Sequence, residues 1–264
     1  MPRAELKEVS IYYEISGRAD APVLMLSSSL GTTGEMWKPQ LEAFGRDYQV
    51  LRYDMRGHGR SSTPPGPYSI QQLAADVVAL LDSLGLDKVD YCGLSIGGMI
   101  GQWLGANLPS RLNRLILCNT AAKIGTEETW NGRIAAVQVG GMAAIIDGGA
   151  MERWFTPGFR NARSPMFIEM RDMLAATDPV GYIAACAAIR DMDQRATAAS
   201  IVTSTLVIAC EHDPVTTVSD AQFLHDSISG STLTVLPASH ISNVEAAQQF
   251  NAAVLGFLAG GPND

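Results

Sequence analysis

Apolar residues in this chain form short runs separated by longer segments of helical periodicity. Short runs rich in Val, Leu and Ile are typical of buried strands, and apolar residues at every third or fourth position are typical of amphipathic helices. We expect strands at residues 9–15, 23–27, 48–53, 89–92, 112–118, 205–210 and 232–236. We expect helices at residues 70–84, 98–108, 218–228 and 243–258, and a short helix containing Trp37, Leu41 and Phe44.

The order of these elements predicts the fold class. Strands and helices alternate as far as Thr120, which indicates an α/β fold with a mostly parallel, doubly wound sheet. From residue 122 to 199 the pattern is mainly helical and alanine-rich, and this segment holds six of the eleven methionines. We interpret residues 122–200 as a helical cap inserted into a core formed by residues 1–121 and 201–264.

Composition and charge narrow the function classes. With 264 residues, 47% of them apolar, the chain has enough material for one large core. No stretch has the length of a membrane span, and the first eight residues lack the apolar region of an export signal. The four cysteines show no metal-binding spacing, so we expect a reduced, cytoplasmic setting. A net charge of −8 argues against nucleic acid or an anionic membrane and favours a small-molecule partner.

Residues 93–97 read GLSIG, between the predicted strand at 89–92 and the helix at 98–108. This is the setting of a nucleophile elbow, a sharp turn that presents a serine at the end of a strand. Gly93 and Gly97 give the turn its room. Ser95 is the predicted nucleophile, and the Ile96 N–H at the helix start is a predicted donor to an oxyanion.

A serine nucleophile needs a base and an acid, which in this topology follow later strands. His240 follows the strand at 232–236 and is the predicted base. Asp213 follows the strand at 205–210 and is the predicted acid, with Glu211 as the alternative. The other three histidines are interpreted as structural; they are His58, His212 and His225.

The second oxyanion donor is expected in the loop after the strand at 23–27. This loop reads Ser-Ser-Leu-Gly over residues 28–31, and the backbone N–H of Leu30 is the predicted donor. The side chains of Ser28 and Ser29 are interpreted as loop residues that form local hydrogen bonds.

Taken together, these motifs resemble the α/β-hydrolase superfamily over essentially the whole chain. Residues 54–62, DMRGHGRSS, match the family's D-x-R-G-x-G-x-S loop, in which we expect Asp54 and Arg56 to tie down loops. The resemblance implies an eight-stranded sheet, a serine triad, and no metal or other cofactor. Ser95 argues against the dehalogenase and epoxide-hydrolase branches, whose nucleophile is aspartate.

A narrower resemblance concerns substrate. Residues 92–105, 115–125, 130–133 and 152–157 are similar to the 3-oxoadipate enol-lactonases of bacterial protocatechuate and catechol degradation. That resemblance implies a serine hydrolase that opens 3-oxoadipate enol-lactone to 3-oxoadipate through an acyl-enzyme. A carboxylesterase or a meta-cleavage-product hydrolase is an alternative on the same scaffold, as is a non-catalytic ligand receptor.

An enol-lactone with a carboxymethyl arm is an anion, which a strongly negative site would repel. Residues 122–200 hold eight Lys and Arg against nine Asp and Glu, so the predicted cap is nearly neutral while the rest of the chain is acidic. Arg133 lies one helical turn from Trp130 and is the predicted carboxylate partner, although a solvated helix position explains it equally well. Trp154 is a further candidate for substrate contact, and Arg153 is the second option for the carboxylate. The oligomeric state is open, and a homo-oligomer is compatible with the sequence.

Overall fold

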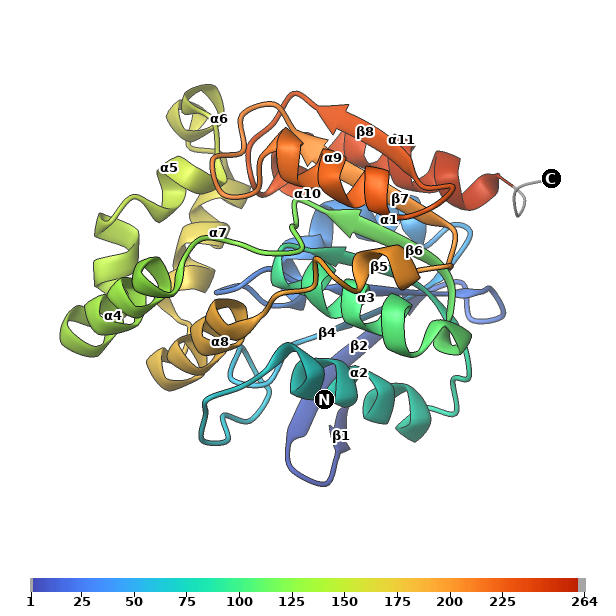
Figure 1. Ribbon diagram of the computed structural model, residues 1–264, viewed down its shortest axis with the longest axis horizontal. Coiled ribbons are helices and arrows are strands. Elements are labelled where there is room, and N and C mark those ends of the chain that lie inside the picture. Colours follow the sequence, from blue (N-terminus) through green and yellow to red (C-terminus); the bar gives the residue numbers. More distant parts are fainter. Residues whose placement is uncertain (1, 261–264) are drawn as a thin grey trace.

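A single eight-stranded sheet runs through the centre of the computed structural model, which describes residues 2–260 (Figure 1). The strand order is β1-β2-β4-β3-β5-β6-β7-β8, and the first two pairings are antiparallel while all the others are parallel. The strands are β1 (Arg3–Glu5), β2 (Ser10–Gly17), β3 (Val23–Ser27), β4 (Gln49–Tyr53), β5 (Val89–Leu94), β6 (Leu112–Cys118), β7 (Thr205–Cys210) and β8 (Thr232–Leu236). The sheet is the mostly parallel α/β arrangement that the alternation of elements predicts.

Helices cover both faces of this sheet. Figure 1 shows α2 (Ile70–Ser83), α3 (Ile96–Asn107) and α9 (Val218–Ser227) on the near face. Behind the sheet lie α1 (Lys38–Phe44) and α11 (Ala247–Ala259), which pack against each other. The remaining short elements are η1 (Gly34–Trp37), η2 (Pro109–Arg111), α10 (Ser242–Glu245) and η3 (Ala198–Ser200).

The central strands are buried on both faces, which explains their nearly continuous apolar sequence. Every residue of β5 and β7 is buried, whereas the first four residues of the edge strand β8 are all exposed or half-buried. Buried parallel strands place their carboxyl ends along one edge of the sheet. The loops at that edge carry the predicted nucleophile, acid and base.

Some predicted boundaries were wrong. Helix α3 begins at Ile96 rather than at residue 98, because the chain turns into the helix directly after Ser95. The closing helix predicted at 243–258 is divided at Ala246 into α10 and α11. Strand β1 was not predicted; it has three residues and is defined by its pairing with β2 rather than by a pattern of its own.

Five α-helices and the short η3 lie between β6 and β7, in the segment for which a helical insert is predicted. The α-helices are α4 (Glu127–Asp147), α5 (Ala150–Trp154), α6 (Pro157–Ala162), α7 (Pro165–Ala175) and α8 (Pro179–Asp191). Figure 1 shows them together at one end of the molecule, where α4 packs along α8. Helix α4 is kinked at Gly141, whose φ of 61° is open to glycine without strain.

Candidate active site

Ser95 occupies the sharp turn between β5 and α3. Its φ of 59° and ψ of −117° are strained for a residue with a side chain, and such strain is concentrated at functional sites. The turn is held on both sides: the Ser95 N–H donates to the Cys118 carbonyl over 2.9 Å, and the Thr120 hydroxyl donates to the Ser95 carbonyl over 2.8 Å. The backbone therefore fixes the direction in which the Ser95 hydroxyl points.

The glycines beside Ser95 are required by close approach of the backbone. A Cβ on Gly93 would lie 2.2 Å from the carbonyl oxygen of Gly97. A Cβ on Gly97 would lie 2.3 Å from the carbonyl oxygen of Ser27 on the neighbouring strand β3. Neither position can take a side chain unless the backbone moves, which is the reason for glycine at both places in the GLSIG motif.

The imidazole of His240 connects Ser95 to Asp213. His240 Nε2 lies 3.0 Å from Ser95 Oγ, and His240 Nδ1 lies 2.8 Å from Asp213 Oδ2. All three side chains are buried. Because a carboxylate can only accept hydrogen bonds, the bond to Asp213 assigns the proton to Nδ1 and leaves Nε2 free to accept the serine proton.

Asp213 is held as a carboxylate by several donors. Its Oδ1 accepts the N–H groups of Val215 and Thr216, and its Oδ2 accepts the Thr216 hydroxyl over 2.7 Å. Burial acts to raise the pKa of Asp213, but the charge and hydrogen bond of His240 and the bonds from Thr216 and Asn119 outweigh it, and the pKa is lowered to about 2. The alternative acid, Glu211, is exposed and has no bond to the imidazole. The structure thus brings Asp213, not Glu211, to His240.

Asn119 is a member of this site that the sequence analysis did not predict. It follows β6 directly, has a positive φ of 43°, and donates from Nδ2 to Asp213 Oδ2 over 3.0 Å. Its own Oδ1 accepts the Ser242 hydroxyl over 2.6 Å, so the amide is fixed in one orientation. Its place after a central strand was the only available sequence signal.

The loop of His240 is bonded to the helical segment above it. The Ser239 hydroxyl lies within hydrogen-bond distance of the carbonyl oxygens of Arg153 and His212. The Ile241 N–H donates to the Trp154 carbonyl over 3.1 Å. The loop of the base is therefore bonded both to helix α5 and to the loop of the acid. His212 itself is exposed, and the fourth histidine, His225, lies on α9.

Two backbone N–H groups are available beside Ser95. Leu30 and Ser95 line the same pocket, and Ile96 is the first residue of α3. Among the residues that the structure describes, neither the Leu30 N–H nor the Ile96 N–H has a hydrogen-bond acceptor. Buried N–H groups are nearly always paired in proteins, so two free ones beside a serine hydroxyl are suited to a developing negative charge.

A small pocket, partly open to solvent, lies over the Ser95 hydroxyl. The predicted residues Trp130, Arg133 and Trp154 all line it. Its other lining residues are Ser29, Leu30, Ser95, Ile124, Ile145, Ala150, Arg153, Tyr182, Ile189, Val215 and His240.

Two guanidinium groups face this pocket. Arg133 lies over the Trp130 ring, with 4.8 Å from its Cζ atom to the ring centroid, and Trp130 is fixed by a 2.9 Å bond from Nε1 to the Ile124 carbonyl. Burial and the neighbouring charge of Arg133 lower the pKa of Arg153. Within residues 2–260, neither arginine forms an ion pair with a carboxylate. Two guanidinium groups thus line the pocket without a paired carboxylate among the described residues, although the whole chain is acidic.

Tyr182 also lines the pocket and was not predicted by the sequence analysis. It lies on α8 and is buried, and burial raises the pKa of its hydroxyl to about 12. A buried tyrosine in a helical, alanine-rich segment gives no sequence signal that separates a pocket wall from ordinary packing.

Comparisons with known proteins identify the family of this chain. The model of the alpha/beta hydrolase fold family matches residues 22–149. The 3-oxoadipate enol-lactonase 2 of Acinetobacter baylyi is 47% identical over 248 residues, which cover 94% of this chain and 92% of that protein. This chain belongs to the α/β-hydrolase family.

Solved structures extend the similarity of this α/β-hydrolase to its full length. The enol-lactonase from Burkholderia xenovorans superposes with a TM-score of 0.96 at 40% identity, covering 98% of this chain and 100% of that one. A hydrolase from Pseudomonas aeruginosa superposes with a TM-score of 0.95 at 43% identity, covering 98% of both chains. The family resemblance predicted from the elbow and the 54–62 loop is confirmed.

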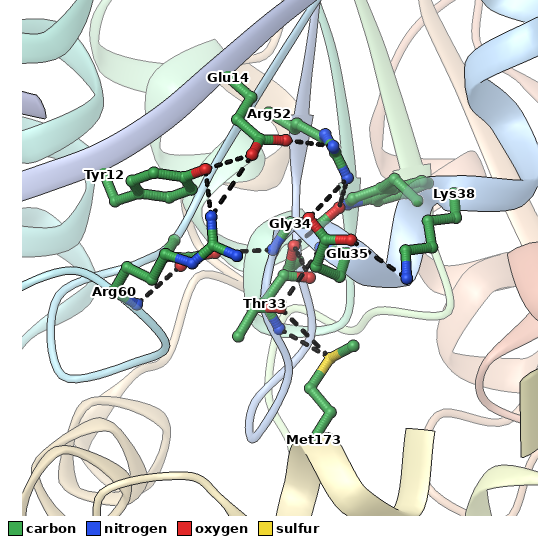
Figure 2. Close-up of polar contacts among 12 residues, drawn as sticks. Tyr12, Glu14, Thr33, Gly34, Glu35, Lys38, Arg52, Arg60 and Met173 are labelled. Carbon is green, nitrogen blue, oxygen red and sulfur yellow. Dashed lines mark hydrogen bonds and ion pairs between the residues drawn. The ribbon is translucent and has the colours of Figure 1, made fainter. Parts of the chain in front are cut away.

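The 54–62 loop of the hydrolase ties other loops down, as its sequence predicts. Asp54 accepts the N–H groups of Gly34 and Arg60, each over 2.8 Å, and the Arg56 guanidinium forms a buried pair with Asp76 on α2. Figure 2 shows Gly34 within a network of charged side chains that joins β2, β4 and η1. Through this network the segment that follows Leu30 is anchored to the sheet.

The same segment is also bonded to helix α7. The Thr33 N–H and hydroxyl both lie within hydrogen-bond distance of the Met173 sulfur (Figure 2). Lys38 forms an ion pair with Glu169 of α7 over 3.0 Å. Within the described part of the hydrolase, no cluster of three or more His, Cys, Asp or Glu side chains could hold a metal ion. No described helix has both the length and the apolar character needed to cross a membrane.

Proposed function

We propose that this α/β-hydrolase opens 3-oxoadipate enol-lactone to 3-oxoadipate by a serine acyl-enzyme mechanism. The proposal is supported by the arrangement of Ser95, His240 and Asp213 and by the similarity of the chain to 3-oxoadipate enol-lactonases at 47% and 38% identity. The proposed partner is therefore a small anionic lactone.

The observation that carries the substrate class is the charge of the pocket. Arg133 and Arg153 face the space over Ser95 without a carboxylate partner among the described residues. Two partly buried guanidinium groups close together repel each other, and an anionic ligand between them relieves that repulsion. The free carboxylate of an enol-lactone has the geometry that a guanidinium binds through two parallel hydrogen bonds.

In the first half of the reaction, the Ser95 hydroxyl attacks the lactone carbonyl while His240 Nε2 takes the serine proton. The 3.0 Å separation of Ser95 Oγ and His240 Nε2 is within reach for this transfer. The carbonyl oxygen becomes negative and is stabilised by the N–H groups of Leu30 and Ile96. Asp213 stabilises the imidazolium and keeps its orientation.

Collapse of the tetrahedral intermediate breaks the ring C–O bond and releases an enol oxygen, which His240 protonates. The acyl-enzyme then carries the whole opened chain as an ester of Ser95. His240 next takes a proton from water, the hydroxide attacks the ester carbonyl, and Ser95 leaves with the proton from His240. The sum is one lactone and one water giving the enol of 3-oxoadipate, which tautomerises to the 3-oxo form by moving a proton from oxygen to carbon.

The direct test is the loss of enol-lactone absorbance when the purified protein is added, with identification of 3-oxoadipate as the product. We expect turnover by the wild-type protein and none by Ser95→Ala. Turnover of neutral nitrophenyl esters with none of the enol-lactone would replace the proposal by a carboxylesterase function. Tight binding of the lactone without multiple turnovers would replace it by a ligand receptor.

A further inference from the structure

The peptide that presents the Leu30 N–H is fixed from one side by Thr32. The carbonyl oxygen of Ser29 belongs to the same peptide unit as the Leu30 N–H. It accepts the Thr32 N–H over 3.2 Å and the Thr32 hydroxyl over 2.8 Å. Because a peptide unit is planar, holding its carbonyl oxygen also sets the direction of its N–H. These bonds do not constrain the peptide unit between Leu30 and Gly31.

The next peptide unit is held by His58. The Gly31 N–H donates to His58 Nε2 over 3.1 Å, and His58 Nδ1 lies 3.2 Å from the carbonyl oxygen of Arg56. A carbonyl oxygen can only accept, so Nδ1 carries the proton and Nε2 presents its lone pair to Gly31. His58 is 1% exposed, and burial lowers its pKa to about 4, which keeps the ring neutral and in this tautomer at neutral pH.

Both partners of this bond have little freedom. Gly31 has a φ of 78°, and a Cβ there would lie 2.5 Å from a methyl carbon of Leu174. The Gly31 carbonyl accepts the Thr177 hydroxyl over 3.2 Å. The turn of His58 is closed by its own N–H donating to the Met55 carbonyl over 3.0 Å. The imidazole therefore joins two rigid turns from different strands.

We infer that His58 is a positioning residue for the second oxyanion donor: its neutral imidazole holds the Gly31 peptide and thereby fixes the direction of the adjacent Leu30 N–H. The inference rests on the proposed function, because it assigns the oxyanion to Leu30. Without an acceptor at the position of Nε2, the buried Gly31 N–H loses its partner and the Leu30 peptide is no longer fixed on both sides. His58 acts through Leu30 and does not touch the substrate.

Three substitutions separate this role from general packing. His58→Gln places an amide oxygen near the position of Nε2 and can still accept from Gly31. His58→Asn has the same functional group but reaches only the position of Nδ1. His58→Met fills the space without a comparable acceptor. His225→Gln, on helix α9, serves as the matched histidine control.

Three measurements are made on each folded variant: kcat for the enol-lactone, the dissociation constant of 3-oxoadipate, and the inhibition constant of phenylboronic acid. The boronate forms a tetrahedral anion on a serine and therefore reports on the oxyanion donors. We expect kcat and boronate affinity to fall together by about 10- to 100-fold in His58→Asn and His58→Met, with 3-oxoadipate binding within about twofold of wild type. We expect His58→Gln and His225→Gln to stay within about threefold of wild type.

Equal activity of His58→Gln and His58→Asn would overturn the inference, because it would show that reach to Gly31 does not matter. Loss of 3-oxoadipate affinity in parallel with kcat would overturn it in favour of a packing role. If His58→Met does not fold, the Gln and Asn pair still decides the question. Ser95→Ala distinguishes a failure of the proposed function from a failure of this inference. Full activity of Ser95→Ala rejects the proposed function. An inactive Ser95→Ala, together with unchanged activity of the His58 variants, rejects only the positioning role of His58.

Discussion

Asn119 Nδ2 donates a hydrogen bond to Asp213 Oδ2, the same oxygen that accepts from His240. The amide thus helps to hold the carboxylate that orients the base. We predict that Asn119→Gly lowers kcat roughly tenfold, the effect of about 1.4 kcal/mol of lost transition-state stabilisation. Glycine is the chosen replacement because it accepts the positive φ of this position, so the loss reports on the amide and not on backbone strain.

The measurement is kcat together with the free energy of unfolding in urea. Removal of the amide also leaves the Ser242 hydroxyl without its acceptor, so a loss of about 1–3 kcal/mol in stability is expected. A variant that is destabilised but keeps full kcat would show that Asn119 supports only the fold.

The second prediction concerns the nucleophile. Ser95→Ala should reduce kcat by several orders of magnitude with unchanged far-UV circular dichroism, because only binding and oxyanion effects remain. A serine-directed fluorophosphonate should label the wild-type protein once, at Ser95, as read by peptide mass spectrometry. Ser83→Ala, on α2, is the control and should be labelled like wild type. Labelling of Ser95→Ala at another serine with retained turnover would reject the mechanism.

The third prediction compares two carboxylates that lie two residues apart. Asp213→Asn should lower kcat by about 10⁴-fold, because an amide at this position no longer favours the productive tautomer of His240. Glu211→Gln should stay close to wild type, since that side chain is exposed. Steady-state kinetics of both variants decide the assignment, and a larger effect at Glu211 would reverse it.

The fourth prediction tests charge recognition in the pocket. Arg133→Met and Arg153→Met should each weaken kcat/KM for the anionic enol-lactone by about 1.5–3 kcal/mol, the range for hydrogen bonds to charged groups. Turnover of a neutral nitrophenyl ester should hardly change, because the triad is intact in both variants. Equal losses on both substrates would assign the arginines to packing or to the chemistry itself.

The fifth prediction concerns stability against pH. His58 has a pKa of about 4 in the folded protein and takes up a proton near pH 6.5 when unfolded. The unfolded chain therefore binds more protons between these values, and the stability linked to His58 is complete above pH 6.5 and is lost as the pH falls toward 4. We expect a contribution of about 2 kcal/mol to disappear between pH 7.5 and pH 5.

Urea unfolding of the wild type and of His58→Gln at these two pH values isolates the contribution of His58 protonation to stability. The variant has no ring to protonate, so the stability difference between the two proteins should move by about 2 kcal/mol in favour of the variant at pH 5. A constant difference would show that His58 titrates normally in the folded state.

The strands and the triad were accessible from sequence because each has a local signal. The buried strands are continuous apolar runs. Ser95 stands in a five-residue motif whose glycines are required because a Cβ at either position would lie 2.2 or 2.3 Å from a backbone carbonyl oxygen. Asp213 and His240 each follow a predicted strand, and parallel strands bring their carboxyl ends to one edge.

Other features depend on contacts between distant segments. Strand β1 exists through its pairing with β2, and the amide of Asn119 meets Asp213 across 94 positions of sequence. The neighbouring positions of Arg133 and Arg153 depend on how α4 and α5 pack, with the Gly141 kink between them. No periodicity in a single segment encodes such contacts.

The walls of the pocket come largely from one continuous stretch of chain. From Ile124 to Ile189 this stretch supplies both tryptophans, both arginines and Tyr182, whereas Ser95, Asp213 and His240 come from the loops of the sheet. Under the proposed function, selectivity and reactivity are thus encoded in separate parts of the gene. Recombination or mutation confined to that one stretch can explore new substrates while the bond-breaking apparatus is inherited unchanged, which makes it the natural target for redirecting the enzyme by directed evolution.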